Sequence, residues 1–307
     1  MLSSAVQDRL LSLRNLPTIP NVASEALHLI EHQHTSAGRL GRIIEQDQTL
    51  TARVLHVANS PFYGFPREIS TIDLAIVILG FNAIREIILS LVVQKVLLNL
   101  DERVFDSRGF WRYSIFCGTT ARFLARKLGY RMAGEAFVAG LMHDIGVLMI
   151  AQHFSRELRL IREAQAKTGA PLVVAEEAVL GSHHGPIGAW LAERWNLPAQ
   201  LIHAIGAHHD EPPPHAGAPD NGNVDSISTS LDDIDHPLTA IVALSEWFAA
   251  HMGYRDWAHE REFSPLNFPP ALMTRLGAHD AFDSRSAIEA LTPALTEEFE
   301  KGKVFNN

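Results

Sequence analysis

The chain has 307 residues, of which 47% are hydrophobic and 20% are charged, and its formal net charge at pH 7 is -9. The hydrophobic share supports a sizeable core, which excludes a globally disordered chain, and the length allows two domains or one large domain. The negative charge argues against sequence-independent binding to nucleic acid, because that binding needs a basic face. The single cysteine, Cys117, cannot form an internal disulfide, which fits a reducing cytoplasm.

Neither a leader nor a membrane span is expected. Residues 1–9 lack the continuous apolar segment of a signal peptide. Polar side chains interrupt the most apolar stretch, residues 74–100, so we interpret it as a buried helix that is too polar to span a membrane. The interrupting residues are Gly80, Asn82, Arg85, Glu86, Gln94 and Lys95. We therefore expect a cytoplasmic protein without membrane contact.

Residues 1–100 predict an all-helical lobe, because their apolar residues recur at spacings of three and four rather than in alternation. Asn21 and Asn82 are interpreted as N-caps, and Gly80 is expected to end a helix that begins near Ser70. Helices are expected over residues 4–14, 21–30, 37–45, 48–59, 70–80 and 82–98.

One pair of histidines in this lobe has the spacing of metal ligands. His28 and His32 are separated by about one helical turn, so they could share an ion. No third ligand accompanies them, and both are therefore expected to face solvent.

The polar segment Asp101 to Gly109 is interpreted as a hinge between an N-terminal lobe, residues 1–105, and a second lobe, residues 106–307. The second lobe also has helical periodicity, most clearly in a seam that begins at Phe110 and ends at Leu128. Residues 210–236 are rich in proline, glycine and acids and contain no lysine or arginine, so they predict a mobile acidic loop. Further helices are expected over residues 155–167, 172–180, 187–195, 198–209, 237–249, 270–276 and 286–301.

The most informative segment runs from Gly134 to Gly146, where an apolar stretch ends in the adjacent pair His143 and Asp144. An imidazole nitrogen and a carboxylate oxygen are both good ligands for a divalent metal. For an isolated pair, the alternative is a hydrogen-bonded histidine beside a solvated aspartate. Further pairs at His183-His184 and His208-His209 weaken that alternative, although histidines are also common near helix ends.

Leu141-Met-His-Asp-Ile-Gly146 resembles the central motif of the HD superfamily, whose catalytic members are metal-dependent phosphohydrolases. Six collinear patches resemble the HDOD domain, the HD-related output domain of bacterial signalling proteins, over roughly residues 10–250. These patches are Leu16–Pro20, Val57–Ser60, Ile72–Gly80, Phe110–Ser114, Gly188–Pro198 and Ala204–His209. The resemblance implies an all-α fold with an N-terminal helical bundle and an HD-like lobe.

The resemblance also implies a pocket in which the histidine pairs converge and which could hold one divalent ion, such as iron, manganese or zinc. The implied ligands are His143, Asp144, His184, His208 and His209.

Three pocket positions depart from the family pattern. Tyr113 stands where a histidine supplies the first ligand, and a neutral phenol is a poor replacement for imidazole. Val147 stands where the phosphodiesterase branch has lysine, so a cation that could hold phosphate is missing there. Glu246 is the nearest match to the final aspartate. The Gly-Tyr-Pro motif of cyclic-dinucleotide phosphodiesterases is also missing after the paired histidines.

We predict a catalytically inactive signal-transduction or regulatory module of bacteria that acts through contacts with other signalling proteins. The alternative is a metal-dependent phosphohydrolase, with a cyclic dinucleotide as the candidate substrate. Its chemistry requires a metal to activate water and to clamp phosphate oxygens, and the departures from the family pattern weaken that case. A nucleic-acid-binding regulator is the third reading, but the chain has neither a basic stripe nor a recognisable DNA-reading motif.

Overall fold

A computed structural model describes residues 2–209, apart from 14, 15, 18, 33, 98, 99, 101 and 104, together with residues 236–255 and 284–306. Within these ranges every regular element is a helix and no strand is formed, which confirms the predicted all-α fold. The elements are α1 (Ser4–Ser12), α2 (Asn21–Glu31), α3 (Ala37–Ile44), α4 (Gln48–Ala58), α5 (Ile72–Leu97), α6 (Ser107–Leu128), α7 (Ala133–Met142), α8 (Ile145–His153), α9 (Ser155–Thr168), α10 (Leu172–Leu180), α11 (His184–Arg194), α12 (Ala199–Ala207), α13 (Pro237–His251), α15 (Ser284–Gly302) and the 3-10 turn η4 (Lys303–Asn306).

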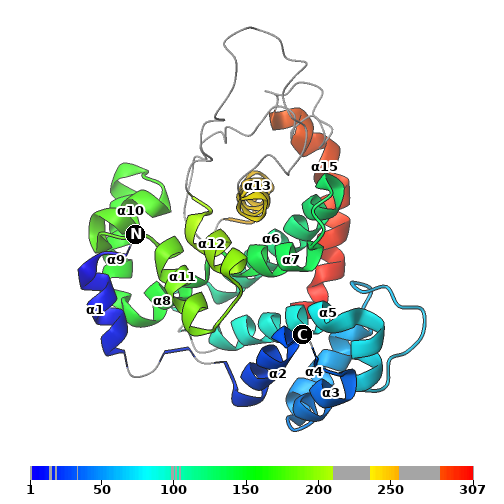
Figure 1. Cartoon of the computed structure of the whole chain (residues 1–307). Helices are drawn as coiled ribbons and strands as arrows, with labels where there is room; N and C mark the ends of the chain where they lie inside the picture. Colours follow the sequence, from blue (N-terminus) through cyan, green and yellow to red (C-terminus); the bar gives the residue numbers. More distant parts are fainter. Residues whose placement is uncertain are drawn as a thin grey trace, which may run out of the picture.

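Helices α2 to α5 pack against one another at one end of the molecule (Figure 1). Gly80 interrupts α5 with φ 82° and ψ 165°, a conformation open mainly to glycine, so the predicted break is confirmed as a kink within one long element. Two predicted caps were wrong by one residue. Asn21 is the first residue of α2, with Pro20 before it as the cap. The hydroxyl of Thr71, rather than that of Ser70, accepts from the Leu74 N–H at 3.2 Å, because it lies three residues before that donor.

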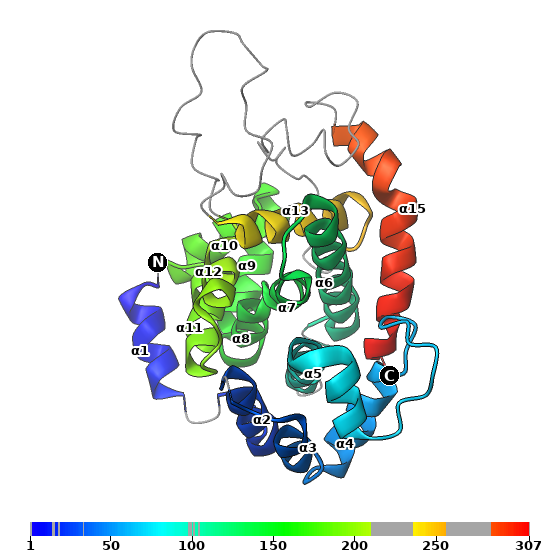
Figure 2. The same ribbon diagram turned by 45° about the vertical axis from the view of Figure 1, so that its right-hand side comes forward.

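Helix α6 lies at the centre of the second lobe and contacts α7, α13 and α15 (Figure 2). Asp106 begins this helix, because its carboxylate accepts from the Gly109 N–H at 2.9 Å. The predicted seam is confirmed, and each of its members is at most 2% exposed. These members are Phe110, Ser114, Cys117, Ala121, Leu124 and Leu128.

The boundary between residues 1–105 and 106–307 stays a prediction, and both ends of the chain cross it. Helix α1 lies against α9 and α10 (Figure 1), where Arg9 pairs with Glu157 at 2.6 Å and the Ser3 hydroxyl donates to the Leu180 carbonyl at 3.1 Å. Near the other end, the ring of Phe305 lies 5.1 Å from that of Phe62. The buried apolar residues form one continuous core.

Two helical segments, Ile72–Leu97 and Ala133–His153, are long and apolar enough to cross a membrane by length and composition alone. The expectation that polar residues make the first of them too polar was therefore wrong by that measure. Both are mostly covered by other parts of the chain, because 56% of the most apolar window of the first segment and 83% of that of the second are buried. Since the core helices of water-soluble proteins pass the same test, this is weak evidence for a membrane span.

Two predicted elements lie outside the described residues. They are the acidic loop over residues 210–236, of which only His236 is described, and the helix over residues 270–276.

Candidate metal centre

The His-Asp pair lies in the short turn between two buried apolar helices. Helix α7 ends at Met142 and α8 begins at Ile145, so His143 and Asp144 are held between them. Helix α8 crosses α11 closely because Gly146 has no side chain, and a Cβ at this position would overlap the His184 carbonyl. This close crossing brings Asp144 next to His184, the first residue of α11.

The structure brings four of the predicted ligands together around one point. Asp144 Oδ1 lies 2.9 Å from His184 Nε2 and 3.3 Å from His208 Nε2, and His184 Nε2 lies 2.8 Å from His209 Nε2. One ligand atom from each of these four residues lies within 4.8 Å of the other three. His143 lies at the edge of this group, with its Nε2 3.5 Å from Asp144 Oδ2.

Hydrogen bonds at Nδ1 point three of the imidazoles inward. His143 donates from Nδ1 to the Gly140 carbonyl at 2.8 Å, and His208 donates to the Ile205 carbonyl at 2.8 Å. His184 has Nδ1 2.6 Å from Glu176 Oε2. In neutral imidazoles these bonds turn the Nε2 lone pairs toward the centre, as in metal-binding histidines.

Glu176 is the residue that sequence reasoning missed. It lies on α10, is 1% exposed, and accepts from both the backbone N–H and Nδ1 of His184. The available signal was its spacing from Leu172 and Ala175, which places it on the buried face of an amphipathic helix.

His183 does not join the ligand group, although it precedes His184 directly. Its Nδ1 accepts from the Gly185 N–H at 3.2 Å, so it caps the start of α11. Burial and the neighbouring charge of His184 lower the pKa of His183 to about 4.

The central atoms cannot all be satisfied by neutral imidazoles. A neutral imidazole carries one N–H, so His184 cannot donate to Glu176 and to Asp144 together. Its Nε2 also faces the Nε2 of His209 at 2.8 Å, where two lone pairs repel unless a proton or a cation lies between them. The carboxylate of Asp144 is buried and faces only the Nε2 atoms of histidines, which satisfy it only where they carry a proton. This donor set fits a divalent cation.

The pKa directions describe the centre without a metal, where a proton rather than a cation lies beside Asp144. Burial raises the pKa of Asp144, but His143 and His184 lower it by more than burial raises it, so this pKa lies well below its ordinary value. Burial lowers the pKa of His184, but Glu176 and Asp144 outweigh this effect and raise it well above its ordinary value. Burial together with His208 and His184 lowers the pKa of His209. Without a metal, the centre therefore combines the negative charge of Asp144 with a protonated His184, and an ion that bound there would displace that proton.

Tyr113 prevents His143 from binding a metal. Its hydroxyl lies 2.9 Å from His143 Nε2, and both side chains are fully buried. Because His143 Nδ1 donates to Gly140, the Tyr113 hydroxyl donates to Nε2 and occupies the lone pair that a metal would need. Burial and the charges of Asp144 and Glu246 raise the pKa of Tyr113 well above its ordinary value, so it is a neutral phenol.

Val147 and Glu246, the other two positions that depart from the family pattern, lie in different surroundings. Val147 is 2% exposed and belongs to the hydrophobic core, so it supplies no polar group. Glu246 reaches the site, with Oε2 3.9 Å from His209 Nδ1. Arg255, which no motif pointed to, forms a buried ion pair with Glu246.

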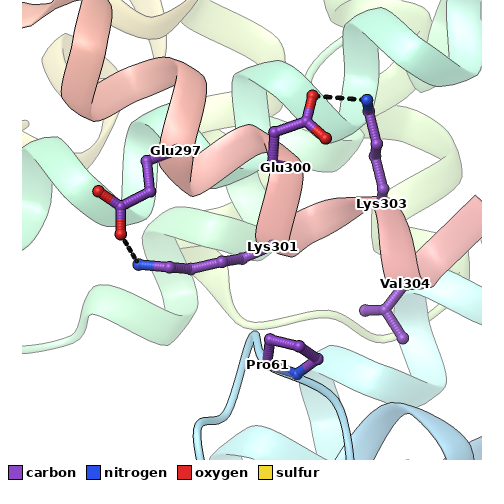
Figure 3. Close-up of a pocket in the computed structure, with 6 residues that line it drawn as sticks. All are labelled: Pro61, Glu297, Glu300, Lys301, Lys303 and Val304. Carbon is purple, nitrogen blue, oxygen red and sulfur yellow. Dashed lines mark hydrogen bonds and ion pairs between the residues drawn. The ribbon is translucent and has the colours of Figure 1, made fainter.

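A surface hollow lies elsewhere, between Pro61 and the end of α15 with η4 (Figure 3). Lys301 pairs with Glu297 at 2.8 Å and Lys303 pairs with Glu300 at 2.5 Å, so the charges that line it cancel. None of the histidines of the metal centre lines this hollow.

A helical fold in which a His-Asp turn meets later histidines defines a protein of the HD-related class. The family model of the HDOD domain matches residues 16–211. The chain therefore belongs to the HDOD family, as the sequence motifs predicted.

Solved structures agree with this fold. An HDOD domain protein of Geobacter sulfurreducens superposes with a TM-score of 0.71 at 22% identity, covering 98% of this chain and 96% of that one. A protein of Shewanella amazonensis SB2B that is provisionally named a phosphohydrolase gives 0.69 at 23% identity, covering 99% and 98%. A protein of Marinobacter aquaeolei VT8 that is provisionally named a signal transduction protein gives 0.66 at 22% identity, covering 100% and 62%.

An uncharacterized protein of Treponema pallidum (strain Nichols) is 26% identical over 212 residues. The match covers 69% of this chain but only 40% of that protein. This relative thus carries much additional sequence, and its similarity concerns the shared segment alone.

Proposed function

We propose that this chain is a regulatory module of bacterial signal transduction whose HD-like lobe holds one divalent ion and does not hydrolyse phosphoesters. The observation that carries the proposal is the hydrogen bond between Tyr113 and His143, fully buried and 2.9 Å long. It removes one imidazole from the ligand pool and leaves Asp144, His184, His208 and His209 to hold a single ion. When bound, the ion neutralises the buried carboxylate and supplies the positive charge that separates the facing nitrogen lone pairs.

The burial of the site supports a structural or regulatory ion over a catalytic one. Four protein side chains are available to one ion, which is typical of closed sites, whereas catalytic sites keep a position for water or substrate. Asp144, His184 and His208 are at most 3% exposed. Only the His209 side chain, at 18% exposure, faces a route to solvent among the four.

The proposed mode of action is contact with other signalling proteins in the cytoplasm. The negative net charge disfavours nucleic acid as a partner, and the family is that of an output domain. An ion that ties α8, α11 and α12 together would then set the rigidity of the lobe that a partner meets.

A metal-dependent phosphohydrolase is the second candidate, favoured by one observation. Arg255 brings to the site the kind of cation that is missing at Val147, and guanidinium groups bind phosphate well. It ranks second because Glu246 already neutralises Arg255. The provisional name of the Shewanella structure is compatible with either candidate.

The test combines metal analysis with hydrolysis assays on the purified full chain. We expect about one equivalent of iron, manganese or zinc, and no turnover of a cyclic dinucleotide or an aryl phosphodiester above that of the H143A/D144A variant. Robust hydrolysis by the wild type that is lost in this variant would establish the phosphohydrolase instead.

A further inference from the structure

The centre contains two overlapping ligand sets that share His208. One set is Asp144, His184, His208 and His209, and the other is His143, His208 and Glu246. Because His208 donates from Nδ1 to the Ile205 carbonyl, only its Nε2 can bind a metal. One ion at a time can use that nitrogen, so the two sets exclude each other.

Glu246 is the only carboxylate of the second set, and it is already engaged. Its Oε1 pairs with Arg255 Nη1, and the two side chains are 8% and 7% exposed. A cation that entered the second set would lie close to the Arg255 guanidinium. Repulsion between two cations is strong in a poorly solvated interior, so this set is disfavoured while Arg255 is present.

We propose that Arg255 is a positioning residue that withholds Glu246 from the metal and so directs a single divalent ion to Asp144, His184, His208 and His209. Tyr113 acts in the same direction on His143, another member of the second set, because its hydroxyl occupies His143 Nε2. The inference rests on the proposed single-ion site and goes further, since it identifies the residue that selects between the two sets.

If Arg255 instead oriented Glu246 as a metal ligand, its removal would have the opposite effect on metal affinity. Residues behind a metal ligand often orient it through a hydrogen bond, and losing such a residue weakens metal binding. If Arg255 oriented Glu246 as a ligand, removing Arg255 would lower the metal affinity. If Arg255 withholds Glu246, removing it frees a carboxylate and maintains or raises the affinity.

The experiment is a double-mutant cycle on zinc affinity, measured on metal-free full-length protein by competition with a chromophoric chelator. The proteins are wild type, E246Q, R255M and the double variant. We expect E246Q to change the affinity of the wild type by less than about threefold, and that of R255M by about tenfold or more, because the freed Glu246 has become a ligand. An equal effect of E246Q in both backgrounds, or weaker zinc binding by R255M alone, would overturn the inference.

Controls separate metal selection from folding. Arg255→Lys keeps the cation and should behave as the wild type does. R255M leaves a buried carboxylate without its counter-charge, which destabilises a protein strongly, whereas the double variant removes both charges. If R255M does not fold without metal, the measurement becomes the gain in stability on adding zinc. A larger gain for R255M than for the double variant would show that Glu246 has become a ligand. Equal gains would contradict the inference.

The outcomes also distinguish this inference from the proposed function. Zinc binding by R255M but not by the wild type would refute the single-ion site, and would support only the part of the inference in which Arg255 withholds Glu246 from a metal. No binding by either protein would refute both. Binding by the wild type with an additive cycle would refute the role of Arg255 alone.

Discussion

Glu176 holds His184 at two points, accepting from its backbone N–H at 2.9 Å and from its Nδ1 at 2.6 Å. The same carboxylate oxygen makes both contacts, so the start of α11 and the orientation of the imidazole are fixed together. His184 is the ligand that faces both Asp144 and His209. Much of the geometry of the centre therefore depends on a carboxylate that does not itself reach the ion position.

The first prediction concerns this carboxylate. Glu176→Gln should lower the affinity for zinc by about 10- to 100-fold, because the amide keeps the shape but loses the charge that orients and polarises His184. Competition with a chelator measures the effect. Glu177→Gln is the matched control, since Glu177 is the exposed neighbour on the same helix, and it should bind zinc as the wild type does. Equal losses in both variants would contradict a specific role for Glu176.

The second prediction concerns the pH dependence of the metal-free protein. The raised pKa of His184 means that its contribution to stability is complete below the ordinary pKa of 6.5 and is lost as pH rises through the higher folded value. The lowered pKa values of His143, His183 and His209 act oppositely, because the unfolded chain takes up their protons first as pH falls below 6.5.

Stability of the metal-free protein should therefore be greatest near pH ~6.5 and fall on both sides. Denaturant titrations of chelator-treated protein between mildly acidic and alkaline pH measure this. Added zinc should stabilise most on the alkaline side, where protons compete least for the imidazoles. A stability that rises steadily from pH 6 to pH 9 without metal would contradict the raised pKa of His184.

The third prediction concerns Tyr113. Tyr113→Phe keeps the ring but removes the only donor to His143 Nε2 that the described contacts provide, so it should cost roughly 1–3 kcal/mol of unfolding free energy. Tyr254→Phe, at a half-buried tyrosine, should change the stability by less than about 0.5 kcal/mol. Stability equal to the wild type in the first variant would mean that water or a metal replaces the hydroxyl.

The fourth prediction concerns the crossing of α8 and α11. Gly146→Ala should destabilise the protein and lower the affinity for zinc, because the added methyl group overlaps the His184 carbonyl and separates the helices that carry Asp144 and His184. Gly38→Ala is the control, since a Cβ there meets only Asp73 Oδ2 at 3.9 Å and alanine favours a helix. Thermal melts with and without zinc measure both effects.

The fifth prediction separates the two kinds of contact that hold α1. Leu10 is fully buried, so Leu10→Ala should cost about 2–5 kcal/mol. The Arg9 side chain is 43% exposed in its pair with Glu157, so Arg9→Ala should cost less than about 1 kcal/mol. Urea denaturation measures both. A larger loss for Arg9→Ala would show that the contacts of Arg9, which also donates to the His153 carbonyl and lies over the Phe154 ring, secure the helix more than apolar burial does.

The helices and the histidine cluster were predictable from the sequence for local reasons. Apolar spacing defines α4 and α6, a positive φ suits Gly80, and the His-Asp turn follows from an apolar segment that ends at a polar pair. The motif resemblance supplied the rest of that prediction, because spacing alone does not say that α8, α11 and α12 meet.

The partners of the ligands were not predictable in the same way. Glu176 contacts His184 across the turn between α10 and α11, and Arg255 turns back onto Glu246 after the end of α13; helical periodicity does not encode contacts across a helix end. The docking of α1 on α9 and α10 was missed for a related reason. An amphipathic helix shows which face is covered, but its sequence does not identify the surface that covers it.

The single continuous core has a consequence for dividing the chain. Cutting at the predicted hinge would leave residues 1–105 without the surface that covers α1, and residues 106–307 without Phe62, one of the rings that pack against Phe305. Each fragment would then expose apolar faces in water and tend to aggregate. Produced together, the two fragments carry complementary faces on both sides of the cut, which makes this chain suited to reconstitution from halves that do not fold apart.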